Sequence, residues 1–159
     1  MEPIYMTRAT LNRLKDEAQY LERELKTTIA EEISKAAALG DLSENAEYDA
    51  AKDKQRTFAT KLQNVMMRMN RAQLIETLSI SGTTISIGTR AHLLNLHTGE
   101  EITYTILGEG DYDLEKNIIA YSAPIAKSLM TKQRGEVVTI KVPAGEEEFI
   151  VMNIEKVFN

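Results

Sequence analysis

Two carboxylate side chains follow a glycine near position 40, between two long stretches of alternating polar and apolar residues. Asp41 and Glu44 are three positions apart and come directly after Gly40. Carboxylate oxygens suit Mg²⁺, but Mg²⁺ takes about six oxygen ligands and usually draws several of them from water and phosphate. Two carboxylates therefore predict an incomplete metal site, which ligands from a binding partner would have to complete.

The same spacing has a purely structural explanation. Asp41-Leu42-Ser43-Glu44 has the pattern of a capping box, in which one side chain caps a helix and a carboxylate three residues later bonds back. Acidic residues are also stabilised at the N-terminal end of a helix. Spacing alone favours this capping interpretation. Both interpretations can hold together, because a cap that orders the turn also fixes the carboxylates.

A short basic stretch follows the acidic turn. Lys52 and Arg56 are four positions apart and share a helical face, whereas Lys54 points elsewhere. A solvated face with ordinary pairing, such as Arg56 with Asp53, explains this stretch. The alternative is a patch that contacts phosphates one to two turns behind the acidic residues.

Two stretches without Gly or Pro must position the turn, and they span residues 7–39 and 45–76. Apolar residues recur in each at intervals of three and four, which predicts two helices that pack lengthwise. Gly40 is typical of a helix end, and a short turn makes the two helices antiparallel. At 1.5 Å per residue, the arm from Leu11 to Leu39 is about 42 Å long. The positions of this spacing, apolar except for Gln55, are Leu11, Leu14, Ala18, Leu21 and Leu25 in the first stretch, and Tyr48, Ala51, Gln55, Phe58, Leu62, Val65, Met69 and Ala72 in the second.

The second half of the chain has a different pattern. Residues 102–106, 136–142 and 148–157 alternate or cluster apolar residues as strands do, and glycines separate them. Residues 124–132 predict one short helix that begins at Pro124. The fold class is therefore α+β: an N-terminal antiparallel helical coiled coil over residues 1–78, followed by a small sheet domain with one helix over residues 79–159.

Composition excludes several classes of protein. The chain has no Cys, which excludes disulfides and thiolate metal sites. Its formal net charge of −5 argues against a protein that coats nucleic acid, so any RNA contact should be local. No apolar run approaches the roughly 20 residues that span a bilayer. We expect a cytoplasmic protein without membrane attachment, monomeric when free.

A specific resemblance enters at the acidic turn. Gly40-Asp41-Leu42-Ser43-Glu44-Asn45-Ala46-Glu47-Tyr48, followed by Ala50-Ala51-Lys52, resembles the tip signature of the bacterial Gre transcript-cleavage factor family. The resemblance covers essentially the whole chain, from Met6-Thr7 through Ala72-Gln73-Leu74-Ile75 to Pro124-Ile125-Ala126. A nine-residue match at one turn, within the predicted two-part architecture, favours a functional role for Asp41 and Glu44.

The resemblance implies a partner and a reaction. The coiled coil would enter the secondary channel of bacterial RNA polymerase, and an FKBP-like domain would dock at the channel entrance near Ser122, Pro124 and Ile125. The reaction is hydrolysis of nascent RNA in backtracked complexes, at an active site that belongs mainly to the polymerase. The chain would therefore stimulate an enzyme rather than be one.

Individual residues acquire roles by the same resemblance. Asp41 and Glu44 would help hold a second Mg²⁺ and activate the attacking water, and this Mg²⁺ is shared with the polymerase and not bound stably by the chain alone. Four basic residues would contact the 3′ segment of the nascent RNA: Lys52, Arg56, Lys54 and Lys35. Gly40, Asn45 and Tyr48 would support the tip, and Tyr48 either stacks on a base or packs on the first helix.

This sequence departs from the family pattern at several positions. Lys26-Thr27 stands where many relatives have Arg-Pro, which predicts a straighter first helix. Ala37 and Leu39 replace polar residues, which thins the basic patch. Ala123 replaces a common Ser, and Thr131 a common Gly. These last two substitutions affect the expected docking surface more than the expected fold.

Two other functions fit parts of the sequence. The first is a regulator that binds in the polymerase channel without promoting cleavage, as relatives with altered tips do; Asp41 and Glu44 argue against it. The second is an independent FKBP-like prolyl isomerase that carries a helical arm. Its aromatic pocket would have to come from Tyr104, Tyr112, Tyr121 and Phe149, without any Trp.

Overall fold

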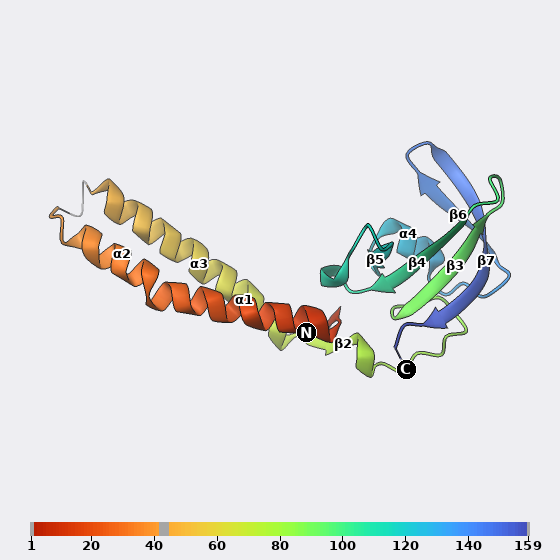
Figure 1. Cartoon of the computed structure of the whole chain (residues 1–159), viewed down its shortest axis with the longest axis horizontal. Coiled ribbons are helices and arrows are strands. Elements are labelled where there is room, and N and C mark those ends of the chain that lie inside the picture. Colours follow the sequence, from red (N-terminus) through yellow and green to blue (C-terminus); the bar gives the residue numbers. More distant parts are fainter. Residues whose placement is uncertain (1, 42–44, 159) are drawn as a thin grey trace. The chain divides into compact units, whose positions relative to one another are not determined.

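The structure is a computed structural model that describes residues 2–41 and 45–158 (Figure 1). Contacts divide the chain into two compact units, one of Leu11–Arg71 and the other of Glu2–Thr10 with Ala72–Asn159. The domain limits predicted from the sequence, 1–78 and 79–159, stay a prediction. The contacts between residues place residues 72–78 in the unit that contains the sheet, whereas the sequence placed them with the helices. The α+β class is confirmed.

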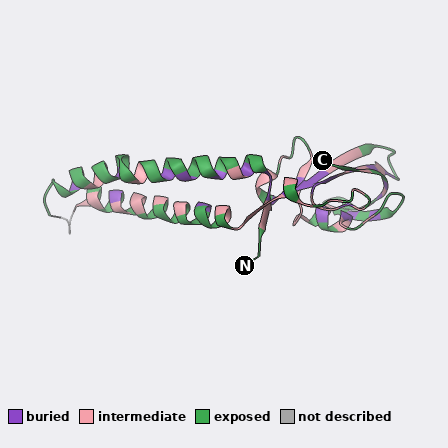
Figure 2. Ribbon diagram, turned by 90° about the horizontal axis from the view of Figure 1, so that it is seen from below, coloured by how far each residue is buried: buried purple, intermediate pink, exposed green. Residues whose placement is uncertain are grey.

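The first unit is a helical hairpin. It comprises α1 (Arg8–Lys26, from Leu11 onward), α2 (Thr28–Ala37) and α3 (Ala46–Asn70). Exposed residues cover most of the helical surface in Figure 2, and buried ones recur at intervals along it. These buried positions follow the predicted spacing of three and four, and they include Leu14, Ala18, Leu21, Ile29, Ala36, Ala51 and Val65. The rings of Tyr20 and Phe58 also meet across the hairpin, with centroids 6.4 Å apart.

The first predicted helix is interrupted at Thr27, so the expectation of one straight helix is wrong at this residue. Thr27 has φ −114° and ψ −86°, outside helical geometry, and separates α1 from α2. Its hydroxyl donates to the carbonyl of Arg23 at 2.7 Å, and its backbone N–H donates to the same oxygen at 3.0 Å. A Thr side chain that bonds back to position i−4 competes with the helical ladder and bends the helix.

The second predicted helix ends six residues earlier than expected. It stops at Asn70, and residues Ala72–Leu74 form strand β2 instead of the last helical turn. β2 pairs in parallel with β1 (Ile4–Met6), and a short 3₁₀ helix, Ile75–Thr77, follows. The pairing strand is distant in sequence, so the helical spacing that continues to Ala72 could not reveal it.

The second unit is built on a five-stranded sheet with the order β5-β4-β3-β7-β6. All neighbouring strands are antiparallel except β4 and β5. The predicted short helix, α4, spans Pro124–Leu129 and begins at Pro124 as expected. The strands are β3 (Thr89–Asn95), β4 (Glu101–Leu107), β5 (Ile118–Ala120), β6 (Val137–Val142) and β7 (Gly145–Lys156).

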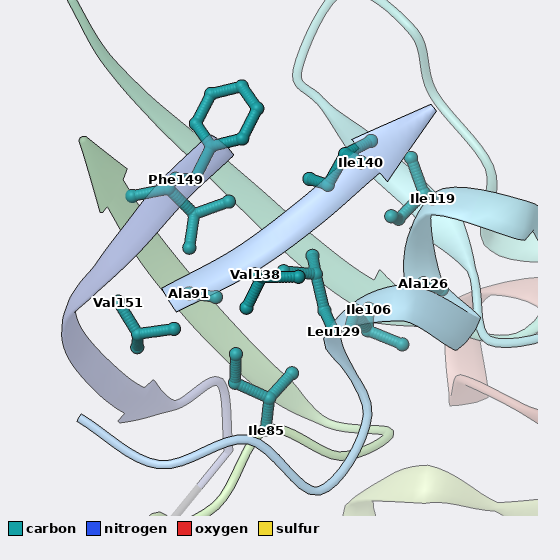
Figure 3. Packing of buried hydrophobic residues seen from close by; sticks show 11 residues of the cluster. Ile85, Ala91, Ile106, Ile119, Ala126, Leu129, Val138, Ile140, Phe149 and Val151 are labelled. Atoms are coloured by element: carbon teal, nitrogen blue, oxygen red, sulfur yellow. The ribbon is translucent and has the colours of Figure 1, made fainter. Parts of the chain in front are cut away.

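The core of this unit lies between α4 and one face of the sheet. Figure 3 shows side chains of α4, Ala126 and Leu129, meeting those of the strands. Eleven buried residues form the cluster: Ile85, Ala91, Leu93, Ile106, Ile119, Ala126, Leu129, Val138, Ile140, Phe149 and Val151. Their burial follows the period-two spacing of β3 and β6, in which alternate residues face inward. Within the described residues, no helix is long and apolar enough to cross a bilayer.

The N-terminus of α1 is fastened within the second unit by two distant carboxylates. Asp111 accepts from the backbone N–H of Thr7 at 3.1 Å and of Gly108 at 2.9 Å, and from the hydroxyls of Thr7 and Thr10. Glu76 accepts from the backbone N–H of Arg8 at 2.9 Å. The Thr7 hydroxyl oxygen also accepts from the N–H of Thr10 at 3.4 Å, as an N-cap side chain does. Asp111 thus joins the start of α1 to the turn after β4.

Thr131 has a backbone conformation that its side chain disfavours. Its φ is +70°, in the left-handed region, and its N–H donates to the carbonyl of Ile85 at 2.8 Å. A β-branched residue in this region is strained by roughly 1–2 kcal/mol, whereas Gly adopts it freely. This geometry explains why a Gly suits the position better than Thr.

We expect Thr131→Gly to stabilise the second unit by about 0.5–1 kcal/mol, because relief of strain exceeds the added entropy of the unfolded chain. Urea unfolding, followed by NMR amide signals of β3 and β7, measures the change. Thr139→Gly is the matched control. Thr139 lies within strand β6, where a Gly weakens the strand, so this substitution should destabilise the second unit. A lower midpoint for Thr131→Gly than for the unsubstituted chain would refute the strain at this position.

Candidate functional site

The turn between α2 and α3 begins with Gly40. Helix α2 ends at Ala37, Ala38 is its C-cap, and the Leu39 N–H donates to the Ala36 carbonyl at 3.1 Å. Gly40 has φ +120°, a backbone conformation that residues with a Cβ rarely adopt. No atom lies within 4 Å of the place a Cβ would occupy, so backbone geometry and not crowding requires Gly here. The helix thus ends three residues earlier than Gly40 predicted, and Gly40 lies in the turn and not at the cap.

A single amide, that of Asn45, closes the turn from the other side. Its Oδ1 accepts from the backbone N–H of Tyr48 at 3.0 Å, which makes Asn45 the N-cap of α3. Its Nδ2 donates to the carbonyl of Ala36 in the last turn of α2, at 2.6 Å. One side chain therefore caps the first turn of α3 and adds a second bond to a carbonyl in the last turn of α2. The support roles predicted for Asn45 and Tyr48 remain predictions, and this geometry favours them.

The capping-box interpretation of Asp41 is wrong. Helix α3 begins at Ala46, so Asp41 lies too far before it to act as its N-cap, and Asn45 occupies that position. Asp41 is exposed, and it has at least one interaction with its surroundings. Glu44, the other half of the predicted pair, lies outside the described residues together with Leu42 and Ser43.

We expect Asn45→Ala to loosen the turn. The substitution removes the cap and the link to Ala36, and loss of an N-cap side chain typically costs about 1 kcal/mol. Hydrogen exchange of the Tyr48 amide should therefore become roughly fivefold faster. Asn45→Ser is the matched control, because Ser retains a capping oxygen but lacks the amide donor, and it should leave Tyr48 protected. Equal exchange of Tyr48 in Asn45→Ala and in the unsubstituted chain would show that this cap does not hold the turn.

Asp41 borders a shallow hollow of about 430 Å³ at the turn. Asn45, Ala46 and Glu47 line it together with Leu39, whose side chain is 66% exposed. The hollow thus brings Glu47 to the same surface as Asp41, which the reasoning from sequence did not single out. Glu47 could have been found from its position in the first turn of α3, because helical side chains are directed toward the N-terminus of their helix and therefore toward this turn. Among the described residues, no three side chains of the types that bind metals come together.

The predicted basic patch divides into two pairs of residues with different surroundings. Lys35 and Lys54 line one hollow of about 400 Å³ between α2 and α3. Lys54 also pairs with Glu32 at 3.2 Å, across the two helices. Lys52 and Arg56 do not line that hollow, in agreement with the prediction that they share another face of α3. Arg56 pairs with Asp53 as the ordinary interpretation expected.

The predicted docking segment lies at the start of α4. Pro124 is the first residue of this helix and is exposed, whereas Ile125 packs partly against the core. The Ser122 hydroxyl donates to the Glu109 carboxylate at 2.8 Å. Nearby, the rings of Tyr121 and Tyr5 meet edge to face, with centroids 5.9 Å apart. The segment is therefore ordered by its neighbours and presents Pro124 to solvent.

Comparisons with known proteins match both parts of the chain. Residues 80–156 match the family described as "Transcription elongation factor, GreA/GreB, C-term", and residues 4–74 match "Transcription elongation factor, N-terminal". Transcription elongation factor GreA of Anaeromyxobacter sp. (strain K) is 35% identical over 154 residues, which cover 97% of this chain and 93% of the relative. GreA of Amoebophilus asiaticus is 37% identical over 150 residues, covering 94% and 96%.

Two solved structures are also similar over most of their length. GreA factor homolog 1 of Thermus thermophilus is 19% identical, covers 97% of this chain and 99% of its own, and has a TM-score of 0.43. GreA/GreB from Nitrosomonas europaea is 15% identical, with coverage of 97% and 98% and a TM-score of 0.43.

The described residues define the class as a two-part α+β protein, with a helical hairpin that exposes Asp41 followed along the chain by a sheet unit with one helix. The sequence matches are more specific than this class. The chain belongs to the GreA/GreB family of transcription elongation factors, and its curated relatives are named GreA.

Proposed function

We propose that the chain enters the secondary channel of RNA polymerase and stimulates the polymerase's own cleavage of nascent RNA in backtracked complexes. The observation that carries this proposal is the exposed Asp41 at the end of a helical hairpin, in a turn ordered by Gly40 and Asn45. A narrow hairpin can reach a site that a globular domain cannot enter. Cleavage then returns the RNA 3′ end to the polymerase active site and elongation resumes.

The carboxylates at the turn have the chemistry of a partial Mg²⁺ site. Asp41 supplies hard oxygen ligands. Glu44, which lies outside the described residues, would add two more carboxylate oxygens. Because Mg²⁺ takes about six ligands, the polymerase and the RNA must provide the rest. When bound, the ion neutralises charge on the phosphodiester and activates water. The task of Asp41 and Glu44 is to position this water and to hold their share of the ligand shell.

The basic residues would steady the extruded RNA 3′ segment. Lys52 and Lys35 have no ion pair among the described residues and are available to phosphates. Lys54 and Arg56 would have to exchange their present carboxylate partners. Such exchange is inexpensive, since exposed ion pairs contribute at most about 1 kcal/mol. RNA would then be held through its backbone without preference for its sequence.

The second unit would dock at the channel entrance through the segment of Ser122, Pro124 and Ile125. Exposed Pro124 offers an apolar contact, and the bond from Ser122 to Glu109 holds the chain just before it. Docking by a separate surface lets the hairpin contribute reach and chemistry while the sheet unit contributes affinity. The chain would act in the cytoplasm as a monomer.

A backtracked polymerase complex with labelled RNA tests the proposal. Addition of the full chain with Mg²⁺ should shorten the transcript from its 3′ end, and the chain should leave RNA intact when polymerase is omitted. Binding to polymerase without faster shortening would instead identify a channel-binding regulator. Isomerase activity on a proline peptide without polymerase would favour the third function considered from the sequence.

A further inference from the structure

A pocket of about 390 Å³ opens on the sheet of the second unit, and none of the residues assigned to the proposed function lines it. Its floor is apolar and aromatic, with Ile102 and Tyr104 from β4 and Ile140 from β6. Phe149 of β7 completes the floor, and Figure 3 shows it at the same end of the core cluster as Ile140. A volume of this size falls within the range of small-ligand pockets, roughly 300–1,000 Å³.

Three carboxylates surround this floor. Glu100 comes from the β3–β4 turn, Glu101 from the start of β4, and Glu147 from β7. None of the three forms an ion pair within the part of the chain that the structure describes. Their negative charge is therefore not neutralised by described residues, although it borders an apolar surface where charge is costly to leave uncompensated.

Glu147 is fixed in place by a buried neighbour. Asn95, which is 6% exposed, donates from Nδ2 to the Glu147 carboxylate at 3.3 Å. The same Asn95 accepts through Oδ1 from the backbone N–H groups of His97 and Thr98, at 2.9 and 3.1 Å. The amide thus anchors the carboxylate to the β3–β4 turn. A neutral amide orients the carboxylate without cancelling its charge.

The electrostatics of Tyr104 agree with this arrangement. Burial raises the pKa of the Tyr104 hydroxyl, and the negative charge of Glu147 raises it further. Both effects indicate that the carboxylate acts across a region partly removed from water. A cation placed there would interact more strongly with Glu147 than one at an open surface.

The apolar floor and the rim of the pocket, formed by the carboxylates of Glu100, Glu101 and Glu147, together favour one chemical class of ligand. The apolar floor favours methylene groups, and the aromatic faces of Tyr104 and Phe149 also attract cations. The rim favours positive charge. A bare metal ion would use only the rim, and no three metal-binding side chains converge among the described residues. A chain of methylene groups that ends in ammonium groups uses both parts of the pocket.

We propose that this pocket binds a linear aliphatic polyamine, whose methylene chain lies on the floor of Ile102, Tyr104 and Phe149 and whose ammonium groups meet Glu147, Glu100 and Glu101. The inference goes beyond the proposed function and does not depend on it. The charge complementarity of the rim commits the pocket to a cation, and its limited volume commits it to a small one.

NMR titration of the full chain with 1,4-diaminobutane at constant ionic strength tests this proposal. Amide shifts should concentrate on the residues that line the pocket and should saturate. Neutral 1,4-butanediol and the ammonium ion, which each lack one of the two required features, should not reproduce them. Saturable shifts of equal size with 1,4-butanediol, or shifts spread evenly over all acidic surfaces, would overturn the proposal.

A matched pair of variants locates the contact. Glu147→Gln should weaken diamine binding about fivefold, the effect of losing one partly exposed ion pair. Glu148→Gln removes the same charge from the adjacent, outward-facing position of β7 and should leave binding unchanged. Unshifted amides far from the pocket would show that each variant is folded. If Glu147→Gln does not fold, the double variant Glu100→Gln with Glu101→Gln takes its place in the test. Equal weakening by Glu147→Gln and Glu148→Gln would contradict the assignment.

A third arm separates a free polyamine from a protein partner. A glycine-flanked peptide with a single Lys carries the same ammonium group on the same kind of aliphatic stem. The proposal predicts that the diamine saturates the pocket amides at a lower concentration than the peptide. The reverse order would replace the polyamine with a lysine side chain of a polypeptide as the occupant.

Discussion

Asp111→Ala is expected to destabilise the second unit by about 3 kcal/mol. Asp111 accepts from the N–H groups of Thr7 and Gly108 and from the hydroxyls of Thr7 and Thr10. Hydrogen bonds to charged groups contribute roughly 1.5–3 kcal/mol each, and a buried donor left without a partner adds its own penalty. The estimate is well below the sum of four such bonds, because contributions within one network are not additive and the Thr10 hydroxyl can still donate to the Gly110 carbonyl at 3.2 Å. Urea unfolding followed by amide signals of β3 and β7 measures the change.

Asp113→Ala is the matched control for this loss. Asp113 lies in the same connection, and its carboxylate accepts one described hydrogen bond, from the N–H of Glu115 at 3.1 Å. Its removal should cost less than about 1 kcal/mol. Similar unfolding midpoints for Asp111→Ala and Asp113→Ala would show that the start of α1 is not held by Asp111.

The second large effect concerns transcript cleavage. Asp41→Asn combined with Glu44→Gln should bind polymerase as the unsubstituted chain does and should lose stimulation by about 100-fold. This magnitude is typical when one preorganised electrostatic stabiliser is removed from an active site. The amides keep the size of the side chains but lose the negative charge that a Mg²⁺ ligand requires. The measurement is the rate of RNA shortening in a stalled, backtracked complex.

Asp16→Asn combined with Glu17→Gln provides the control for charge. Both residues are exposed on α1, away from the turn, and the double substitution changes the net charge by the same amount. It should leave stimulation intact. Equal loss in both double variants would mean that overall charge, and not the chemistry of the turn, controls the effect.

Much of the architecture was predictable from local patterns. The spacing of three and four through Leu14, Ala18 and Leu21 predicted the helix that buries them, and Gly40 predicted the turn. The break at Thr27 was not predictable, because helical propensity does not distinguish a Thr that bonds outward from one that bonds back to Arg23. The strand Ala72–Leu74 was missed because its partner, Ile4–Met6, lies at the other end of the sequence.

The candidate site was predictable in its location and less so in its details. The family signature identified the turn, but the spacing of Asp41 and Glu44 suggested a capping role that Asn45 fills instead. Asn45 satisfies both helix ends only because the hairpin brings Ala36 next to it. Thr131, in contrast, was predictable: relatives commonly have Gly at this position, and the structure gives Thr131 a φ of +70°, which Gly adopts more readily. The pocket lined by Glu147 is formed by residues of four strands, so no local pattern could reveal it.

The dependence of cleavage on Mg²⁺ tests the central claim most directly. The measurement is the rate of transcript shortening at saturating protein over a range of Mg²⁺ concentrations, for the unsubstituted chain and for Asp41→Asn alone. If Asp41 supplies a ligand to a shared ion, its loss should raise the half-saturating Mg²⁺ concentration by at least about tenfold, and excess Mg²⁺ should restore part of the rate. The same half-saturating concentration and the same maximal rate in both proteins would contradict the account.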